Sequence, residues 1–302
     1  MEFSKPGSIA AERPRARVGA AYSALVGWGA GQALPTPLRS FAYRAFARAV
    51  GVNLDEVELA LASYPSLGDF FARRLRPGSR ALDPAPEAIL APCDGVVAAR
   101  GTADAGDMVQ AKGRNYQLAD LVADAELAGR LTGGAYTTIY LSPRDYHRVH
   151  TPVDAEVLGY DYLPGALWPV NPRVAARRNA LLARNERVVF RLNAGPLGHV
   201  ALVMVGASGV GSIRLAEALS GSGEPGRVIE SGAWRAAHEP RRVELSGVTI
   251  KRGDELGAFR LGSTVVLMFE PGKAELGREV GDAVQFGQRI GTIALAGRGG
   301  AA

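Results

Sequence analysis

The sequence predicts an α+β protein, with a helical region over residues 1–80 and a β-rich domain over residues 81–302. Before residue 80, apolar side chains recur at helical spacing between arginines. From Ile89 onward the pattern changes to short apolar runs separated by Gly, Pro, Asn and Asp, which is typical of strands joined by tight turns. With 302 residues and 47% hydrophobic content, the chain is long enough to bury a substantial core.

Residues 38–50 are predicted to form a helix with an apolar stripe and a basic remainder. The stripe consists of Leu38, Phe41, Ala42, Ala45 and Ala49, and the arginines mostly off it are Arg39, Arg44 and Arg48. Such a helix is suited to lie in a membrane interface, with its arginines against anionic headgroups. An ordinary surface helix packed on a core has the same periodicity, so both interpretations stay open.

Three other segments belong to the helical region: residues 53–63, 70–76 and the weakly apolar stretch 18–38. A second helix is expected from Asn53, a capping residue, to about Ser63, and residues 70–76 again mix aromatic and basic side chains. The uncharged stretch 18–38 contains glycines and prolines instead of the dense Leu, Ile, Val and Phe run of a spanning helix. We therefore expect a region that lies on a membrane without crossing it, with a cleaved signal peptide as the alternative for its basic start.

Seven apolar runs of the second domain are predicted strands. They are residues 95–97, 136–141, 187–192, 200–205, 248–251, 264–269 and 289–295. Residues 251–259 and 285–293 share two glycines four apart around an apolar residue, a device that recurs in small lipoyl-like barrels. These lipoyl-like hairpin repeats support a non-enzymatic alternative, a carrier or adaptor with Lys251 as its attachment site, although no Asp-Lys or Met-Lys pair surrounds that lysine.

Charge and cysteine content narrow the chemistry. Lys and Arg (35) exceed Asp and Glu (30), which favours an anionic partner such as a phospholipid surface. We expect no nucleic-acid partner, because the sequence holds no convincing zinc-finger spacing, aromatic-rich sheet motif or dense Lys/Arg run. The single cysteine, Cys93, excludes an intramolecular disulfide and a thiol-only metal site.

Acid–base candidates occur at two places in the β-rich domain. Asp94 lies on a turn that enters a strand, and His147 and His150 lie three apart on a short loop between Pro143 and Pro152. The histidines could be metal ligands, but the prolines leave too little room for a stable helix and no third ligand is near, so no metal site is predicted. Neutral imidazoles are well matched to proton transfer near neutral pH, which makes both histidines candidate catalytic residues.

Two other stretches are candidates for the site. The aromatic loop 160–171 could wall an apolar pocket or simply cover the core. Gly262 and Ser263 open a strongly apolar strand, and a glycine there removes the side chain that would obstruct attack on its own carbonyl. A Gly-Ser pair by itself is usually just a bend.

Taken in this order, these stretches resemble the phosphatidylserine decarboxylase family over roughly residues 65 to 275. The residues that carry the resemblance are, in chain order, Asp94-Gly95 (acidic turn), 146–150 (paired-histidine loop), 185–187 and 206–213 (connecting strands) and 261–264 (the Leu-Gly-Ser-Thr self-processing motif). The aromatic loop departs from the family pattern at Pro169, where a small polar residue is expected.

The resemblance implies that the chain cuts itself between Gly262 and Ser263 into residues 1–262 and 263–302. In this mechanism Ser263 Oγ attacks the Gly262 carbonyl after losing its proton to His150, which Asp94 orients. Elimination from the resulting ester and hydrolysis then release ammonia and leave a covalent pyruvoyl group in place of Ser263. The two chains are expected to stay associated.

The implied activity is decarboxylation of phosphatidylserine to phosphatidylethanolamine and CO2. The pyruvoyl ketone would form a Schiff base with the substrate amine and accept the electrons released, without pyridoxal phosphate, and His147 would return the proton. The expected enzyme is monotopic on the cytoplasmic face of an anionic cell membrane, and the resemblance implies a homodimer. A related pyruvoyl decarboxylase acting on another serine-headgroup lipid, such as an ether lipid, or on a soluble amino acid is the enzymatic alternative.

Overall fold

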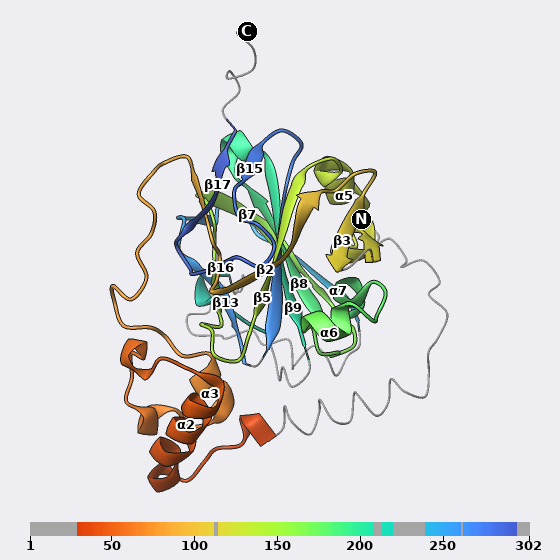
Figure 1. Cartoon of the computed structure of the whole chain (residues 1–302). Coiled ribbons are helices and arrows are strands. Elements are labelled where there is room, and N and C mark those ends of the chain that lie inside the picture. Colours follow the sequence, from red (N-terminus) through yellow and green to blue (C-terminus); the bar gives the residue numbers. More distant parts are fainter. Residues whose placement is uncertain (1–28, 112–113, 208–212, 220–238, 261, 295–302) are drawn as a thin grey trace.

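The computed structural model describes residues 29–111, 114–207, 213–219, 239–260 and 262–294. Figure 1 shows a small helical unit, drawn in red and orange, below a larger strand-rich domain. The protein is therefore a mixed, strand-rich fold with few helices, and the order of helices before strands is as predicted. The signal-peptide alternative and part of the connecting strand 206–213 lie outside the described residues.

The main helix of the helical unit is α2 (Thr36–Val50), which confirms the first predicted helix. Pro37 lies in its first turn, where the missing N–H leaves no bond unmade, and Gly51 ends it in a left-handed conformation with φ 87°. The side chains of Tyr43 and Ala47 are buried against the rest of the unit, whereas Leu38 and Phe41 are exposed. Within the described residues, no helix is long and apolar enough to cross a bilayer.

The predicted second helix is wrong beyond its start. Asn53 does cap a turn, because its side chain accepts from the Asp55 N–H at 3.1 Å, but only the short 3-10 helices η1 (Leu54–Glu56) and η2 (Leu61–Ser63) form. Val57 instead takes an extended conformation and pairs with Leu75, which interrupts any continuous helix. The chain then continues into α3 (Leu67–Phe71).

A nine-stranded antiparallel sheet forms the centre of the larger domain. Its strands in pairing order are β11 (Arg241–Glu244), β7 (Ala155–Leu163), β8 (Arg187–Asn193), β9 (His199–Gly206), β14 (Ser263–Phe269), β5 (Ala135–Leu141), β2 (Gly95–Thr102) and β16 (Ala283–Val284), with β12 (Thr249–Ile250) also on β7. Together with β17, these include all seven predicted strands. The apolar strand β14 lies in the middle, paired with β5 on one edge and β9 on the other.

Different layers cover the two faces of this sheet, as Figure 1 shows, and each face buries a hydrophobic core: the first core lies under the smaller sheets and the second core under the short helices. One face packs on smaller sheets, which consist of β1 (Ala88–Leu90), β17 (Arg289–Ile293) and β15 (Ala274–Leu276), and of β10 (Ile213–Leu215), β13 (Glu255–Phe259) and β6 (Arg148–His150). The other face packs on α4 (Leu118–Val122), α5 (Ala125–Leu131), α6 (Pro172–Ala175), α7 (Leu181–Arg184), β3 (Asp107–Ala111) and β4 (Arg114–Gln117). None of these four helices was predicted from the sequence.

The two segments that echo each other in sequence form the same turn. In each, a glycine has a positive φ, 90° at Gly253 and 85° at Gly287. The side chain of Leu82 lies between the turns, and a Cβ added at either glycine would come within 2.8 Å of it. Glycine is therefore required at both positions for conformation and for space. A lipoyl-like relationship between the two hairpins stays a prediction.

Candidate active site

Ser263 is the first residue of the central strand β14 and is fully buried. Its backbone is opposite Leu141 of β5 and Gly206 of β9, so both neighbouring strands fix its position. Side chains alternate along a strand, and Ser263 therefore points to the same face as Val265, which belongs to the first core. Gly262 comes directly before the strand, and no described atom lies within 4 Å of a Cβ built on it.

His147 is the histidine that contacts the serine. Its Nδ1 lies 3.2 Å from Ser263 Oγ, and its Nε2 lies 3.1 Å from the carbonyl oxygen of Ser142. Because a carbonyl can only accept a hydrogen bond, we assign the ring proton to Nε2. Nδ1 of the neutral ring is then free to accept the hydroxyl proton of Ser263.

His147 is held in its neutral form. The ring is fully buried, and the aromatic ring of Phe71, at the end of α3, covers it with ring centres 4.5 Å apart. Burial lowers the pKa of His147 to about 3, and the positive charge of Arg73 adds to this effect. At neutral pH the imidazole is therefore a proton acceptor, but its surroundings oppose the imidazolium that acceptance would create.

His150 lies in a different environment three residues later. Its Nδ1 donates to the carbonyl oxygen of Gly253 at 2.8 Å, so its Nε2 can accept from the hydroxyl of Tyr146 at 3.2 Å. The ring of Phe286 stacks on it at 3.7 Å. Burial lowers the pKa of His150 to about 4, and the hydrogen bond to Gly253 and the negative charge of Glu255 partly oppose that shift.

Asp94 is paired with an arginine. Arg80 contacts both carboxylate oxygens, at 3.1 Å from Nε and 2.6 Å from Nη2, and the backbone N–H of Phe286 donates to Oδ1 at 2.8 Å. Phe286 therefore links Asp94 to His150, through its amide on one side and its ring on the other. The charge of Asp94 also favours the protonated form of His150, although the two side chains do not bond each other within the described structure.

The contacts differ from the direct chain that was expected to run from Asp94 through His150 to Ser263. The structure brings His147 to the serine, and both ring nitrogens of His150 are engaged elsewhere. The physical reason is that Asp94 binds Arg80 and not His150. The Nδ1 of His150 bonds the carbonyl oxygen of Gly253 instead of the carboxylate. The catalytic roles predicted for these residues are not tested by the contacts and stay predictions.

Four residues that were not among the predicted site residues complete the site. They are Arg80, Tyr146, Phe286 and Phe71, and nothing in an arginine or aromatic residue by itself indicates which histidine or carboxylate it will contact. In the sequence, Gln285-Phe286-Gly287 is recognisable only as part of the repeated turn. That glycine turn was the one sequence feature that could have located Phe286.

The aromatic loop covers the second core. Trp168 packs against that core, and the guanidinium of Arg178 lies 3.5 Å above its ring. Asn185 fixes the loop, because its amide nitrogen donates to the carbonyl oxygens of Trp168 at 2.8 Å and Gly206 at 2.9 Å. Since Gly206 is opposite Ser263 in the sheet, Asn185 connects the loop to the strand end that carries the serine.

Two arginines join the helical unit to the site. Arg148, between the two histidines, donates to the carbonyl oxygen of Ala72 at 3.0 Å and binds both oxygens of Glu255. Arg260, just before the Gly-Ser pair, contacts Asp69 of α3 at 2.8 Å. No cluster of three or more potential metal-ligating His, Cys, Asp or Glu side chains occurs among the residues described.

Comparisons with known proteins identify the family of this chain. Residues 67–292 match the family model described as phosphatidylserine decarboxylase. A phosphatidylserine decarboxylase proenzyme of Anaeromyxobacter sp. (strain K) is 43% identical over 284 residues, which cover 93% of this chain and 95% of the relative. Proenzymes of the same description from Myxococcus xanthus and Brevibacillus brevis are 39% and 37% identical, over 90% and 87% of this chain and 94% and 91% of their own lengths. The chain belongs to the phosphatidylserine decarboxylase family.

Proposed function

We propose that this protein is a phosphatidylserine decarboxylase that is made as a proenzyme and cuts itself between Gly262 and Ser263. The observation that carries the proposal is the buried hydroxyl of Ser263, fixed at the start of a central strand and 3.2 Å from the neutral imidazole of His147. Membership of a family whose relatives are named proenzymes supports it. The carrier alternative gains no support, since the family model and the relatives that match most of this chain are all phosphatidylserine decarboxylases.

Self-cleavage would proceed through atoms that the fold already holds together. Ser263 Oγ adds to the carbonyl carbon of Gly262 and gives its proton to a base, and the peptide C–N bond breaks as nitrogen takes up a proton. Loss of the Cα proton from residue 263 and cleavage of its Cβ–Oγ bond then release the Gly262 carboxylate. The residue left at position 263 is a dehydroalanine with a free amino group. Water hydrolyses its imine form, which liberates ammonia and leaves a ketone at position 263.

His150 is the proposed base, and its electrostatic surroundings support that role. Burial lowers the pKa of both histidines. Glu255 and Asp94 favour a positive charge on His150 against the opposing charge of Arg148, whereas the charge of Arg73 adds to the effect of burial on His147. The contact with Ser263, in contrast, belongs to His147. The proposal therefore requires His150 Nε2 to exchange the hydroxyl of Tyr146 for that of Ser263, while His147 orients the serine.

The residues around position 263 also fit the pyruvoyl group that self-cleavage would create. Such a group supplies an electron-accepting ketone conjugated to the backbone carbonyl. The strand pairing of residue 263 holds that position in place, and the buried ring of His147, which can hold a proton, lies beside it. We propose that His147 delivers this proton to the carbon that loses CO2.

The two chains are proposed to stay together after the cut. Residues 263–302 would contain β14 and β15 to β17. Strands β14, β16 and β17 each pair with a strand of residues 1–262, and β15 pairs with β17. Strand β14 is hydrogen-bonded on both edges and is fully buried throughout. One broken peptide bond at its start leaves this pairing intact.

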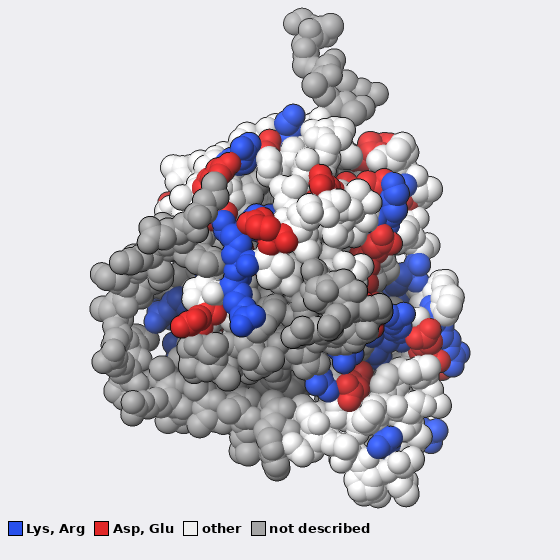
Figure 2. Space-filling model, turned by 180° about the vertical axis from the view of Figure 1, so that it is seen from behind, with Lys and Arg blue, Asp and Glu red and all other residues white. Residues whose placement is uncertain are grey.

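Membrane binding is proposed for the exposed side of α2. Four residues of the predicted apolar stripe are exposed, including Phe41 at 77%, although another side of the helix packs inward. In Figure 2 the helical unit, at the lower right, presents mainly uncharged surface with isolated basic side chains. Such a surface suits a peripheral protein on an anionic membrane. A homodimer on the cytoplasmic face is proposed from the family resemblance alone.

Denaturing mass spectrometry and a decarboxylation assay together test the proposed function. The purified protein should yield residues 1–262 and a blocked, ketone-bearing fragment that starts at position 263. It should release labelled CO2 from carboxyl-labelled phosphatidylserine in vesicles. An ether-linked phosphatidylserine and free serine, assayed beside it, separate the alternative substrates. Active protein with an intact Gly262–Ser263 bond would overturn the proposal.

A further inference from the structure

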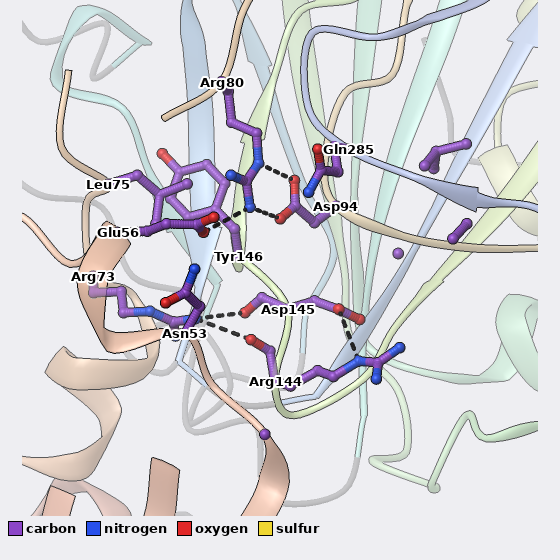
Figure 3. Close-up of a pocket in the computed structure, with 14 residues that line it drawn as sticks. Asn53, Glu56, Arg73, Leu75, Arg80, Asp94, Arg144, Asp145, Tyr146 and Gln285 are labelled. Carbon is purple, nitrogen blue, oxygen red and sulfur yellow. Dashed lines mark hydrogen bonds and ion pairs between the residues drawn. The ribbon is translucent and has the colours of Figure 1, made fainter. Parts of the chain in front are cut away.

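A polar cavity of about 360 Å3 lies between the helical unit and the strand-rich domain (Figure 3). Asn53 and Glu56 line it from the helical unit, and Asp94 and Tyr146 line it from the strand-rich domain. Arg73 follows α3, and in Figure 3 its guanidinium points across to the backbone of the histidine loop. Neither Ser263 nor His147 lines the cavity, so it lies beside the reacting serine and not at it.

Arg73 is a buried cation with unused donors. It is only 3% exposed, and its guanidinium lies 5.4 Å from the centre of the Phe70 ring. Nη2 donates to the carbonyl oxygens of Arg144 at 3.0 Å and Asp145 at 3.2 Å. Within the described part of the chain, Nε and Nη1 have no acceptor. Buried arginines are normally paired, so this one is suited to an acceptor that comes from outside.

The carboxylates that line the cavity are bonded to other groups. Asp94 and Glu56 both bind Arg80, and the carboxylate of Asp145 accepts from the backbone N–H and the hydroxyl of Ser142 at 2.6 and 2.7 Å. None of these three carboxylates bonds Arg73. The fold therefore neutralises Arg80 with its own acids but leaves the positive charge of Arg73 without a bonded counter-ion among the described residues.

We propose that this cavity binds a phosphate-type oxyanion against Arg73 and, resting on the proposed function, that the oxyanion is the phosphodiester of the lipid headgroup. Guanidinium N–H groups are strong donors to phosphate oxygens. The substrate carboxylate must lie at position 263, where CO2 is lost, and that position does not line the cavity. The phosphodiester is the other anionic group of the headgroup, and it is separated from the reacting carbon by one CH2 group and an oxygen.

Titration of the full-length protein with inorganic phosphate at constant ionic strength tests this site. We expect saturable binding, at least tenfold weaker in Arg73→Gln and weakened less in Arg73→Lys, which keeps the charge but not the planar donors. Arg74→Gln is the matched control, because the Arg74 side chain is the neighbouring one and is 63% exposed. Soluble sn-glycero-3-phosphoserine should displace the phosphate, and Arg73→Gln should raise KM for phosphatidylserine more than it lowers kcat.

Several outcomes would overturn the inference. Equal phosphate affinity in wild type and Arg73→Gln rejects Arg73 as the site, and phosphate that glycerophosphoserine cannot displace rejects the headgroup as its source. If Arg73→Gln does not fold, the wild type still tests the site, because a protein that binds phosphate must have a higher unfolding temperature in phosphate than in chloride at the same ionic strength. An equal unfolding temperature in the two salts rejects the site. Wild-type protein that decarboxylates phosphatidylserine without this binding rejects the cavity assignment alone. Protein that neither cuts itself nor decarboxylates rejects the proposed function instead.

Discussion

The central strand and the helical unit are attached to the protein in different ways. Strand β14 is held by backbone pairing along both edges, from Ser263 to Met268 with β5 and to Phe269 with β9. The helical unit has a small core of its own, in which Tyr43 stacks on Phe70 with ring centres 5.0 Å apart. Its contacts with the histidine loop and the Gly-Ser segment run largely through arginine side chains, including Arg148.

The difference shows which part tolerates a cut and which part can be loosened. A strand held by many backbone hydrogen bonds stays in place when one peptide bond at its end breaks, because the pairing depends on no single side chain. A unit held by a few charged side chains can be weakened by one substitution. The reacting serine belongs to the first kind of structure, and Phe71 and Arg73, which surround the histidine, belong to the second.

Ser263→Ala gives the largest expected effect, because it separates the structural role of the strand from its chemistry. We expect complete loss of the fragments 1–262 and 263–302, with the fold retained, since alanine fits the same strand position. Denaturing mass spectrometry detects the uncut chain. Thr264→Val is the comparison at the next residue of the same motif: its hydroxyl is buried without a partner in the described structure, so we expect this variant still to be cut. Normal cleavage of Ser263→Ala would show that the wrong serine was chosen.

His150→Ala and His147→Ala should differ in the step that they impair. We expect His150→Ala to slow self-cleavage by about 100-fold or more, the usual contribution of a general base. His147→Ala should still yield cut protein, but with a comparable loss of decarboxylation. Time courses of fragment formation and CO2 release measure the two steps separately. The reverse pattern would assign the base to His147, the histidine that contacts the serine.

Acid should destabilise the site through both buried histidines. Their folded-state pKa values, about 3 for His147 and about 4 for His150, lie below the unfolded value of 6.5. Above pH 6.5 neither state takes up these protons, whereas between pH 6.5 and 5 only the unfolded chain does. Each histidine should therefore lower the free energy of unfolding by about 2 kcal/mol at pH 5. Urea unfolding from pH 7.5 to 5 measures this fall, and His150→Phe should remove about half of it.

Arg148→Gln should loosen the helical unit more than it disturbs the sheet. It removes the bonds to Ala72 and Glu255, which are partly screened by solvent, so we expect a loss of about 1–3 kcal/mol. Hydrogen exchange should quicken in residues 36–76 and not in β14. Arg44→Gln, exposed on α2, is the control. Equal loosening of both regions would contradict the distinction between them.

Phe41→Ser should produce the smallest effect, confined to membrane binding. The exposed ring contributes nothing to the buried core, so the unfolding temperature should hardly change. If the Phe41 ring inserts into the bilayer, replacing it should weaken the partition of the protein into the membrane by about tenfold. Sedimentation with anionic vesicles measures it, with Ala45→Ser on the same stripe as the milder comparison. Unchanged vesicle binding would remove α2 from the proposed membrane surface.

Local patterns in the sequence determined much of the fold and the choice of the candidate catalytic residues. Short apolar runs between turn residues identified seven strands, because alternation and turn chemistry are local properties. The family resemblance rested on Asp94, the histidine pair and the Gly-Ser bond, each recognisable within a few residues. The short helices α4 to α7 were missed, because each is only four to seven residues long and carries too weak a periodicity.

Only the tertiary structure decided which of these groups meet. His147 and His150 are three residues apart, yet one faces Ser263 and the other faces Gly253 and Phe286, because the chain brings different segments to each ring. Arg80 takes the place beside Asp94 that a histidine was expected to fill. Contacts between segments more than 100 residues apart depend on the packing of the whole domain, which no local spacing specifies.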